Sequence, residues 1–284
     1  MNHQRIGYAT EKMFPAIRNM WHICFGDDME YISFYLTHRF TPDNMMVYCV
    51  NDTPVSMISL LPATLFAEGK QYPVRYVYAV ATLPDYRKNG YARALIQTAH
   101  KHLDEPLILE PASRELQGYY EKMGFKSAFT RKTQTYSTEQ IVEAQGEENG
   151  QCYWLLTITP SEYRARRDLW LGTTGSAYVT WDDTAIAYAL LENDYCDGYA
   201  YKISHHGEED ILLFREEKDM ITVLETSLSE ADLLAVMKKL RINRPVVVRR
   251  PAQAHRIGTE KVSAAGMLLG DIQISNGYLG LTLE

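Results

Sequence analysis

The sequence predicts a protein of the α/β (α+β) class, in which a mixed central sheet is flanked by helices. Residues 77–103 carry most of this prediction, because they read as a buried strand, a basic turn and a helix with apolar residues at helical spacing. The order of hairpin, strand, helix and strand returns in the second half of the chain, which predicts a weak internal repeat. A chain of 284 residues is long enough for two domains.

Composition narrows the classes of partner. The formal net charge of −7 disfavours a nucleic-acid backbone and is compatible with a cationic acceptor. We find neither an N-terminal signal pattern nor an apolar run of about 18 residues, so we expect neither secretion nor membrane spanning. The cysteines stand far apart without C-x-x-C spacing, which indicates small buried thiols in a reducing, cytoplasmic compartment. They are Cys24, Cys49, Cys152 and Cys196.

The first 61 residues predict two helices followed by a hairpin. In order, we expect a short strand near Ile6, a helix that begins at Thr10, a second helix over 29–40, and strands at 46–50 and 55–61. Asp27 and Asp28 immediately precede the second helix, where aspartate is a common N-cap. The alternative is that Asp27, Asp28 and Glu30 attract an amine substrate. We favour capping because it is the commoner use of aspartate at a helix start.

The central strand is predicted at 75–82, with Tyr76, Tyr78 and Val80 on one face. After it, the turn places Gly90 at the start of a helix. Successive backbone N–H groups and the partial positive charge of a helix start favour an anion such as a pyrophosphate. The turn has neither the G-x-x-x-x-G-K-[ST] nor the G-x-G-x-x-G pattern of the common nucleotide-binding loops.

Two short motifs in this region resemble those of a known family. Arg87-x-x-Gly90-x-Ala92 resembles the [RQ]-x-x-G-x-[GA] signature of the GCN5-related N-acetyltransferases (GNAT), and YYEKMGF at 119–125 resembles their later L-Y-E-K-L-G-F segment. The motifs occur in the family's order, with a short strand at 107–110 and a helix between them. The resemblance covers about the first half of the chain, and the two-lobed length is similar to that of the Eis-like acetyltransferases.

The resemblance implies an N-acetyltransferase that uses acetyl-CoA as cosubstrate. The pantetheine arm would pair with backbone groups of the central strand. The pyrophosphate would lie on the basic turn, where the side chains of Arg87 and Lys88 add charge. For Arg87 alone an ordinary surface arginine is the alternative, and the paired motifs favour the phosphate role. The implied cofactor-binding residues are Tyr78, Ala79, Val80, Arg87, Lys88, Asn89, Gly90, Tyr91 and Ala92.

Tyr120 is the implied proton donor. It directly precedes the acidic residue of the second motif, at the position whose hydroxyl points at the sulfur of CoA in the family. A phenol with a pKa near 10 is protonated at neutral pH and can give its proton to a departing thiolate. Tyr119 is the competing candidate, and the alternative for both tyrosines is that they only pack.

The acceptor amine needs a general base, for which the sequence offers two candidates. Glu110 ends the strand at 107–110, and Glu284 would supply the C-terminal carboxylate that Eis-like enzymes use by analogy. Glu110 is open to another interpretation, as a cap of the next helix. That helix is expected to start at 111–113, where Ser113 replaces the asparagine common in the family.

A polar, glycine-bounded run at 145–150 predicts a linker, so we expect domains at 1–145 and 151–284. Capping boxes at Thr159–Glu162 and Ser227–Glu230 are expected to start two helices. His205 and His206 lack a third ligand nearby, which predicts a solvated loop and no metal. Asn276-Gly277 predicts a type I′ hairpin turn within 267–283. Strands are expected at 152–158, 178–181, 185–191, 199–203, 211–214, 221–225 and 246–249, and helices at 160–171 and 233–240.

The second half is similar to a degenerate copy of the acetyltransferase fold. At its corresponding turn, Glu225 and Glu230 would repel a pyrophosphate, so we expect one acetyl-CoA per chain. The favoured function is direct acetyl transfer to a primary amine of a small molecule or peptide. Cys24 and Cys49 lack the context for an acetyl-cysteine relay. The alternatives are a non-catalytic acyl-CoA-binding sensor and an aminoacyl-tRNA acceptor, which the acidic balance disfavours. A homo-oligomer is left open.

Overall fold

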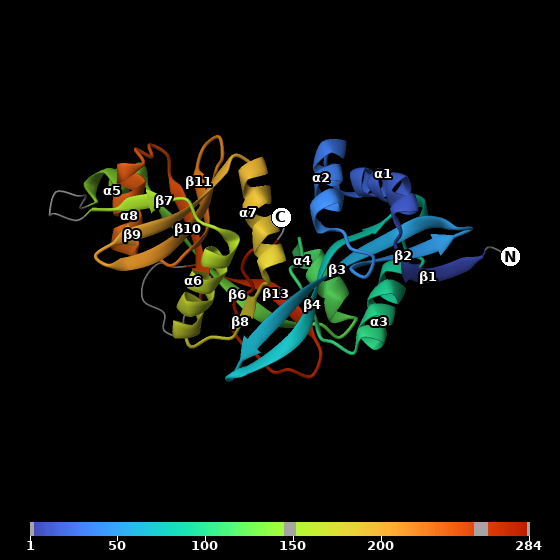
Figure 1. The fold of residues 1–284 in the computed structure, drawn as a ribbon. Coiled ribbons are helices and arrows are strands. Elements are labelled where there is room, and N and C mark those ends of the chain that lie inside the picture. The colour runs from blue at the N-terminus through green and yellow to red at the C-terminus, as the bar shows by residue number, and fades with distance from the viewer. Residues whose placement is uncertain (1–2, 145–151, 253–260, 283–284) are drawn as a thin grey trace. The chain divides into compact units, whose positions relative to one another are not determined.

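The computed structural model describes residues 3–144, 152–252 and 261–282 (Figure 1). The chain forms two compact units. Unit 1 comprises Met1–Leu65, Gln71–Ser127 and Gly266–Gln273, and unit 2 comprises Phe66–Lys70, Ala128–Ala265 and Ile274–Glu284. Each unit contains a mixed sheet and helices, which confirms the predicted fold class.

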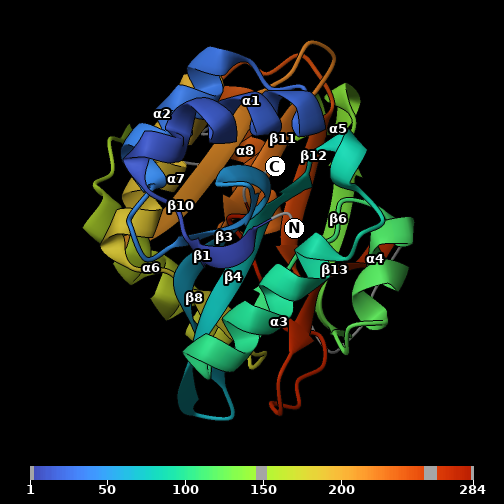
Figure 2. The same cartoon turned by 90° about the vertical axis from the view of Figure 1, so that its right-hand side faces the viewer.

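Unit 1 has the sheet order β1-β2-β3-β4-β5-β13. Its strands are β1 (Gln4–Tyr8), β2 (Met45–Val50), β3 (Thr53–Ala67), β4 (Lys70–Thr82), β5 (Leu107–Leu109) and the part of β13 (Lys261–Leu269) from Gly266 onward. Its helices are α1 (Phe14–Phe25), α2 (Met29–Arg39), α3 (Tyr91–Leu103) and α4 (Arg114–Glu121), with short 3-10 turns η1 (Glu11–Met13) and η2 (Pro84–Tyr86). Helices α1 and α2 lie on one side of β1–β4 and α3 lies on the other (Figures 1 and 2).

The core of unit 1 explains why α3 packs where it does. The apolar positions Leu95, Ile96 and Ala99 recur at helical spacing and are fully buried. They share one hydrophobic cluster with Val77 of β4 and Leu107 of β5. The predicted strand, turn and helix over 77–103 are therefore confirmed, and the helix starts directly after Gly90.

Unit 2 has the sheet order β6-β12-β11-β10-β9-β7. Its strands are β6 (Lys126–Tyr136), β7 (Trp154–Leu156), β8 (Tyr178–Thr180), β9 (Gly198–His205), β10 (Glu208–Glu216), β11 (Ile221–Thr226) and β12 (Val246–Pro251). Its helices are α5 (Thr138–Glu143), α6 (Pro160–Thr173), α7 (Asp183–Tyr195) and α8 (Glu230–Lys239). Helices α5 and α8 contact each other, as do α6 and α7.

The two units repeat one arrangement. In unit 1, β2, β3 and β4 lead into α3 and then into β5, which is parallel to β4. In unit 2, β9, β10 and β11 lead into α8 and then into β12, which is parallel to β11. In both units a strand–helix–strand crossover follows antiparallel strands, as the repeated order in the sequence predicts.

Each unit is completed by a strand from a distant part of the chain. Met267–Leu269 of β13 pairs with Leu109–Leu107 in unit 1, and β6 pairs with β12 in unit 2. The units therefore divide at Ser127 and Ala128, which differs from the expected domains at 1–145 and 151–284. The predicted linker at 145–150 lies outside the described residues.

The helix predicted to begin at Thr10 begins instead at Phe14, after the turn η1, and Thr10 makes no side-chain cap hydrogen bond. Three further local predictions are wrong. Residues 185–191 belong to helix α7 instead of a strand, because the Asp182 carboxylate accepts the Ala185 N–H at 2.7 Å and starts a helix there. The predicted Ser227–Glu230 capping box is absent from α8, whose N-cap is Ser229. The Asn276-Gly277 turn is not of type I′: Gly277 lacks a positive φ and forms a parallel bridge to Phe129.

No helix among the described residues is long and apolar enough to cross a membrane.

Candidate active site

The turn before α3 is shaped by two left-handed residues. Lys88 has φ 65° and Gly90 has φ 80°, and Gly90 is the N-cap of the helix. The side-chain Nδ2 of Asn89 donates to the backbone carbonyl oxygens of Tyr86 (3.1 Å) and Arg87 (3.3 Å), and these hydrogen bonds stabilise the turn. A hypothetical side chain at Gly90 would meet open space, so glycine is required here by its backbone conformation.

Helix α3 differs from most helices of the molecule in how it begins. Gly90 has no side chain, so the cap residue gives the leading N–H groups of α3 no hydrogen-bond acceptor of that kind. Helix α1 also begins without a capping side chain, but it has a proline in its first turn. In the other α-helices of the described residues, a side chain accepts a first-turn N–H; these caps are Asp28, Ser113, Ser137, Thr159, Asp182 and Ser229.

The side chains of the turn are exposed but not all are directed to solvent. Arg87 donates through Nε to the carbonyl oxygen of Thr82 at 3.1 Å, and its Nη2 lies 3.9 Å from Cys24 Sγ. The ring of Tyr91 stacks on Tyr48 with centroids 4.2 Å apart. The turn therefore offers backbone N–H groups at its centre, with the exposed Lys88 and the Arg87 guanidinium beside them.

Strand β4 changes course where the pantetheine arm is predicted to bind. Its parallel pairing with β5 covers Arg75–Leu107 and Tyr76–Ile108 and ends before Tyr78. Ala79, inside the strand, has φ 50°, a conformation that costs a non-glycine residue about 1–3 kcal/mol. The sequence carries no signal for this residue, because alanine has no preference for a positive φ.

Aromatic side chains cover the same part of β4. Tyr78 lies 5.9 Å from the ring of Trp21 and 5.6 Å from that of Tyr35. The indole N–H of Trp21 donates to Asp27 at 2.7 Å, and Asp28 accepts the Tyr31 N–H at 2.7 Å. Capping by Asp28 is therefore confirmed, and Asp27 fixes Trp21, a contact that the sequence analysis missed.

Tyr120 belongs to the core that joins β4 and β5. It is 6% exposed and shares a hydrophobic cluster with Val77 and Leu109. Burial raises the pKa of its phenol strongly, and the neighbouring Tyr119 raises that pKa further. Burial also raises the pKa of Tyr119, which is only partly buried and lies 5.4 Å from Tyr120. Both phenols hold their protons at neutral pH.

Glu110 directly follows β5, and Ser113 caps α4 by accepting the Leu116 N–H at 3.2 Å. Glu110 therefore does not cap that helix. Because β4 and β5 are parallel and Ile108 pairs with Tyr76, Glu110 follows β5 at the level of Tyr78 in β4. Glu284 lies outside the described residues. The start of α3, the end of β4, Tyr120 and Glu110 all belong to unit 1.

His205 does not lie in a solvated loop, as the sequence predicts. His205 is the last residue of β9 and only 5% exposed, and its Nε2 lies 2.8 Å from Asp210 Oδ2. Ligand atoms of His205, Glu208 and Asp210 lie within 4.8 Å of one another, a spacing that could hold a metal ion. Asp210 also accepts from the hydroxyl of Ser227, so this cluster already forms hydrogen bonds near the start of α8.

Residues 5–128 match the family model of the acetyltransferase (GNAT) domain. Two similar crystal structures are GCN5-related N-acetyltransferases. The one from Anabaena variabilis has a TM-score of 0.76 and 16% identity, over 94% of this chain and 72% of that chain. The one from Kribbella flavida has a TM-score of 0.71 and 15% identity, over 94% of this chain and 71% of that chain.

A third similar structure is Eis1 from Mycobacterium abscessus, with a TM-score of 0.66 and 11% identity over 93% of this chain and 73% of that chain. At these identities the likeness shows the fold, and it extends over both units. No curated protein sequence matches the chain.

Proposed function

We propose that this protein, whose residues 5–128 match the model of the GNAT acetyltransferase domain, transfers the acetyl group of acetyl-CoA directly to a primary amine of a small molecule or peptide. The observation that carries this proposal is the glycine-capped start of α3. Its N–H groups and helix dipole suit the pyrophosphate of the cofactor. In most other helices of the described residues, a side chain of the protein fills the equivalent position.

Beside this anion site, β4 supplies the second contact. Its pairing with β5 ends at Tyr76, and the left-handed Ala79 redirects the strand just after. We assign the backbone of Tyr78, Ala79 and Val80 to the pantetheine arm, in the manner of an added strand. Arg87, Lys88, Asn89, Gly90, Tyr91 and Ala92 complete the proposed cofactor site.

The chemistry requires that the amine lose a proton and that the thiolate of CoA gain one. The amine nitrogen attacks the thioester carbonyl, the carbon–sulfur bond breaks, and Tyr120 protonates the departing sulfur. An unperturbed phenol is already protonated at neutral pH and can donate; burial raises the pKa of Tyr120 further, which makes it a weaker acid than a free phenol. For the base we assign Glu110 at the end of β5, with the C-terminal carboxylate of Glu284 as the other candidate.

Tyr120→Phe tests the donor, because it keeps the ring and removes only the hydroxyl. We expect turnover to fall by roughly 10²-fold, the low end for loss of a general acid, with the KM for acetyl-CoA nearly unchanged. Tyr119→Phe is the matched control and should retain most of the activity. A larger effect at Tyr119 would exchange the roles of the two tyrosines.

A panel of amines tests the reaction itself. Purified protein is mixed with acetyl-CoA and each amine, and released CoA is detected with a thiol reagent. Release of CoA that depends on the amine is expected. Acetyl-CoA binding without CoA release for any amine would instead favour an acyl-CoA sensor. We place the reaction in the cytoplasm, because all four cysteines are free thiols.

A further inference from the structure

The hairpin of β9 and β10 in unit 2 brings together side chains that the proposed acetyl transfer does not use. His205 ends β9 and pairs directly with Glu208, the first residue of β10. His206 and Gly207 between them both have a positive φ, as the central residues of a tight two-residue hairpin turn require. Because paired residues project from the same face of a sheet, the imidazole of His205 and the carboxylate of Glu208 lie on one side.

Asp210 joins this face through the alternation of side chains along β10. It stands two residues after Glu208, so the two carboxylates project to the same side of the strand. Its Oδ2 lies 2.8 Å from Nε2 of His205, and one ligand atom from each of the three residues lies within 4.8 Å of the others. The register of the hairpin therefore groups His205, Glu208 and Asp210, which we call the hairpin cluster.

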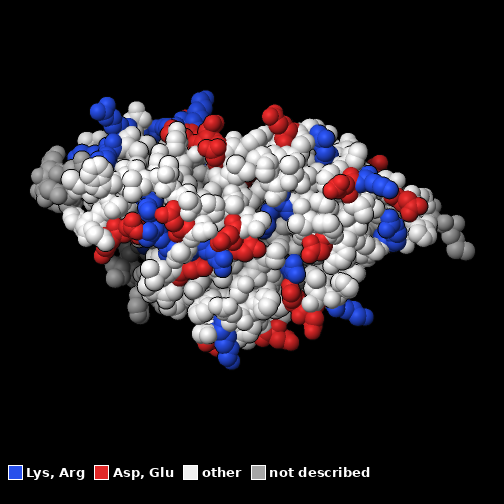
Figure 3. All heavy atoms as spheres, viewed as in Figure 1, with Lys and Arg blue, Asp and Glu red and all other residues white. Residues whose placement is uncertain are grey.

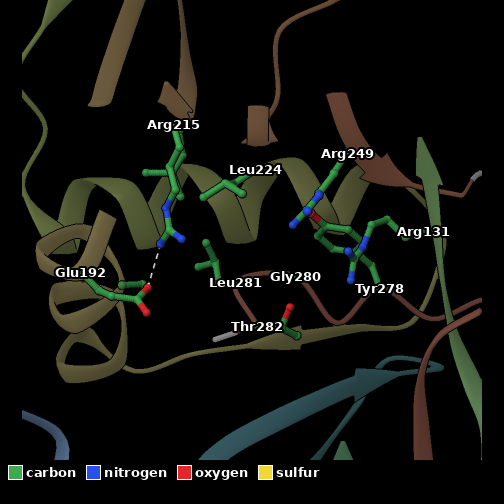
Figure 4. Close-up of a pocket in the computed structure, with 11 residues that line it drawn as sticks. Arg131, Glu192, Arg215, Leu224, Arg249, Tyr278, Gly280, Leu281 and Thr282 are labelled. Carbon is green, nitrogen blue, oxygen red and sulfur yellow. Dashed lines mark hydrogen bonds and ion pairs between the residues drawn. The ribbon is translucent and has the colours of Figure 1, made fainter. Parts of the chain in front are cut away.

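The opposite face of β10 carries a different set of side chains. Arg215 stands an odd number of residues after Asp210 and therefore lies on that face, where its Nη2 donates to Glu192 at 2.9 Å (Figure 4). The hollow drawn there is also lined by Arg131 and Arg249. These three arginines thus lie on the side of the sheet away from the hairpin cluster.

The surroundings of the hairpin cluster are rich in negative charge. Besides Glu208 and Asp210, the carboxylate of Asp232 in α8 lies close, with its Oδ1 3.9 Å from Nδ1 of His205. None of these three carboxylates forms an ion pair with a lysine or arginine in the part of the chain that the structure describes. Arg250 adds positive charge near Asp210 without pairing with it. A divalent cation would balance the remaining negative charge.

The imidazole of His205 has one nitrogen without a partner. The residue is only 5% exposed, and its Nδ1 forms no hydrogen bond with the described residues. A histidine that binds a metal through one nitrogen usually directs the N–H of the other to a carboxylate. A metal at Nε2 would leave the Nδ1–H facing Asp232, whose Oδ1 also accepts the Tyr153 hydroxyl at 2.8 Å. A small rotation of the ring would then satisfy the buried nitrogen.

We propose that the hairpin cluster binds a divalent transition-metal ion such as Zn²⁺ through His205, Glu208 and Asp210. One imidazole nitrogen and two carboxylate oxygens suit Zn²⁺ better than Mg²⁺, which prefers oxygen ligands alone. Bonds of about 2.0–2.2 Å require ligand atoms somewhat closer together than 4.8 Å. The exposed side chain of Glu208 can supply this movement. The site lies outside residues 5–128 and is independent of the proposed acetyl-CoA site.

Titration of the full-length, untagged protein with Zn²⁺ tests the proposal, with a chromophoric zinc chelator as the competitor. We expect a site that binds Zn²⁺ at micromolar concentration and that Mg²⁺ in large excess does not occupy. Zn²⁺ should also raise the midpoint of thermal unfolding, because an ion that binds only the folded protein stabilises it. Absence of Zn²⁺ binding at micromolar concentration, or equal binding of Mg²⁺, would overturn the proposal.

Glu208→Gln locates the site, because this exposed residue can be changed without disturbing the core of unit 2. We expect Zn²⁺ affinity to fall about tenfold or more, since a neutral amide replaces a ligand carboxylate. Glu209→Gln is the matched control. It makes the same charge change on the opposite face of β10, where Glu209 pairs with Arg166 and Lys202, and should bind Zn²⁺ like the wild type. Equal affinity in both variants would place the zinc elsewhere and contradict the assignment.

Asp210→Asn and His205→Gln remove the other two ligands and should each weaken Zn²⁺ binding at least as much. Both residues adjoin the core, so a thermal melt in EDTA checks that each variant is folded. A folded variant with wild-type affinity would contradict the role of the changed residue. Where a variant does not fold, Glu208→Gln and Glu209→Gln decide.

A crystal grown with Zn²⁺ shows the position of the ion directly. We expect its anomalous signal at the hairpin cluster, in contact with His205 and Asp210. A signal confined to other histidines or to cysteines would mean adventitious binding and overturn the proposal.

Discussion

The starts of α3 and α8 occupy the same place in the repeated strand–helix–strand crossover, but the residues that cap the two helices differ. Helix α3 begins at Gly90, which contributes no side chain to the exposed N–H groups. Helix α8 begins at Ser229, which accepts the Asp232 N–H at 3.2 Å and donates its hydroxyl to the Asp232 carboxylate. Asp232 also accepts the Tyr153 hydroxyl at 2.8 Å.

A helix start suits an anion only where the protein leaves its first N–H groups without a side-chain acceptor and without an acidic neighbour. Both helices have the dipole that attracts an anion. At α8 the acidic Glu230 and Asp232 of the first turn already supply the negative charge. At α3 the first turn contains no acidic residue. On the face drawn in Figure 3, acidic and basic side chains are mixed.

Gly90→Glu should produce the largest effect, because it places in α3 the kind of charge that α8 has. Two unit charges about 4 Å apart at an effective dielectric constant of 20 repel by about 4 kcal/mol. We therefore expect acetyl-CoA affinity to fall by roughly 10³-fold in a calorimetric titration. Gly90→Ala is the control, because it introduces the same left-handed strain without a charge. Similar losses in both variants would attribute the effect to strain.

The comparison also predicts one acetyl-CoA per chain, although the crossover occurs twice. Titration of the full-length protein should give a stoichiometry near one, and Gly90→Glu should remove the signal without revealing a second site. A residual site of similar affinity in that variant would show that α8 binds the cofactor despite its acidic cap.

The sequence could predict the α3 turn because its signals are local. A glycine, its basic neighbours and a helical apolar pattern all lie within residues 87–103, and α3 forms over the apolar part. The same holds for the Thr159–Glu162 capping box, which the structure confirms. The Ser227–Glu230 box was predicted from the same pattern and is wrong. Ser227 is drawn instead to Asp210 and the Ile211 N–H, 17 and 16 residues away.

The remaining features depend on contacts that local patterns do not encode. Ala79 takes its left-handed conformation within a strand, and nothing in its neighbours distinguishes it from an ordinary strand residue. The arginines at 131, 215 and 249 come together through strand pairing across more than 100 residues. The spacing of the cysteines and the net charge, in contrast, can be taken from the sequence without the structure.

Ser229→Ala should have a moderate effect on stability. Loss of an N-cap side chain costs about 1 kcal/mol, so the free energy of unfolding measured in urea should fall by that amount. Ser113→Ala removes the equivalent cap of α4 in unit 1 and should cost a similar amount. Neither change should create a second acetyl-CoA site, because Glu230 and Asp232 remain. A stoichiometry above one in Ser229→Ala would show that the serine alone closes the α8 start.

The smallest effect concerns Glu162, which completes the cap of α6. Hydrogen bonding from the Thr159 backbone, then from Lys202 and the Thr159 hydroxyl, lowers the pKa of its carboxyl to about 2. The ordinary value is about 4.3, so the folded state favours the charged form. The resulting stabilisation is fully present above the ordinary pKa and is lost as the pH falls towards 2.

Glu162→Gln separates this titration from the cap itself. Glutamine can still accept the Thr159 N–H, which Glu162 accepts at 3.0 Å, but it carries no proton-dependent charge. We expect the wild type to lose slightly more stability than the variant between about pH 5 and pH 2, measured as the urea midpoint at each pH. Parallel curves for the two proteins would mean that exposure to solvent screens the interaction. The acidic cap would then hold α6 by geometry alone, as a neutral side chain would.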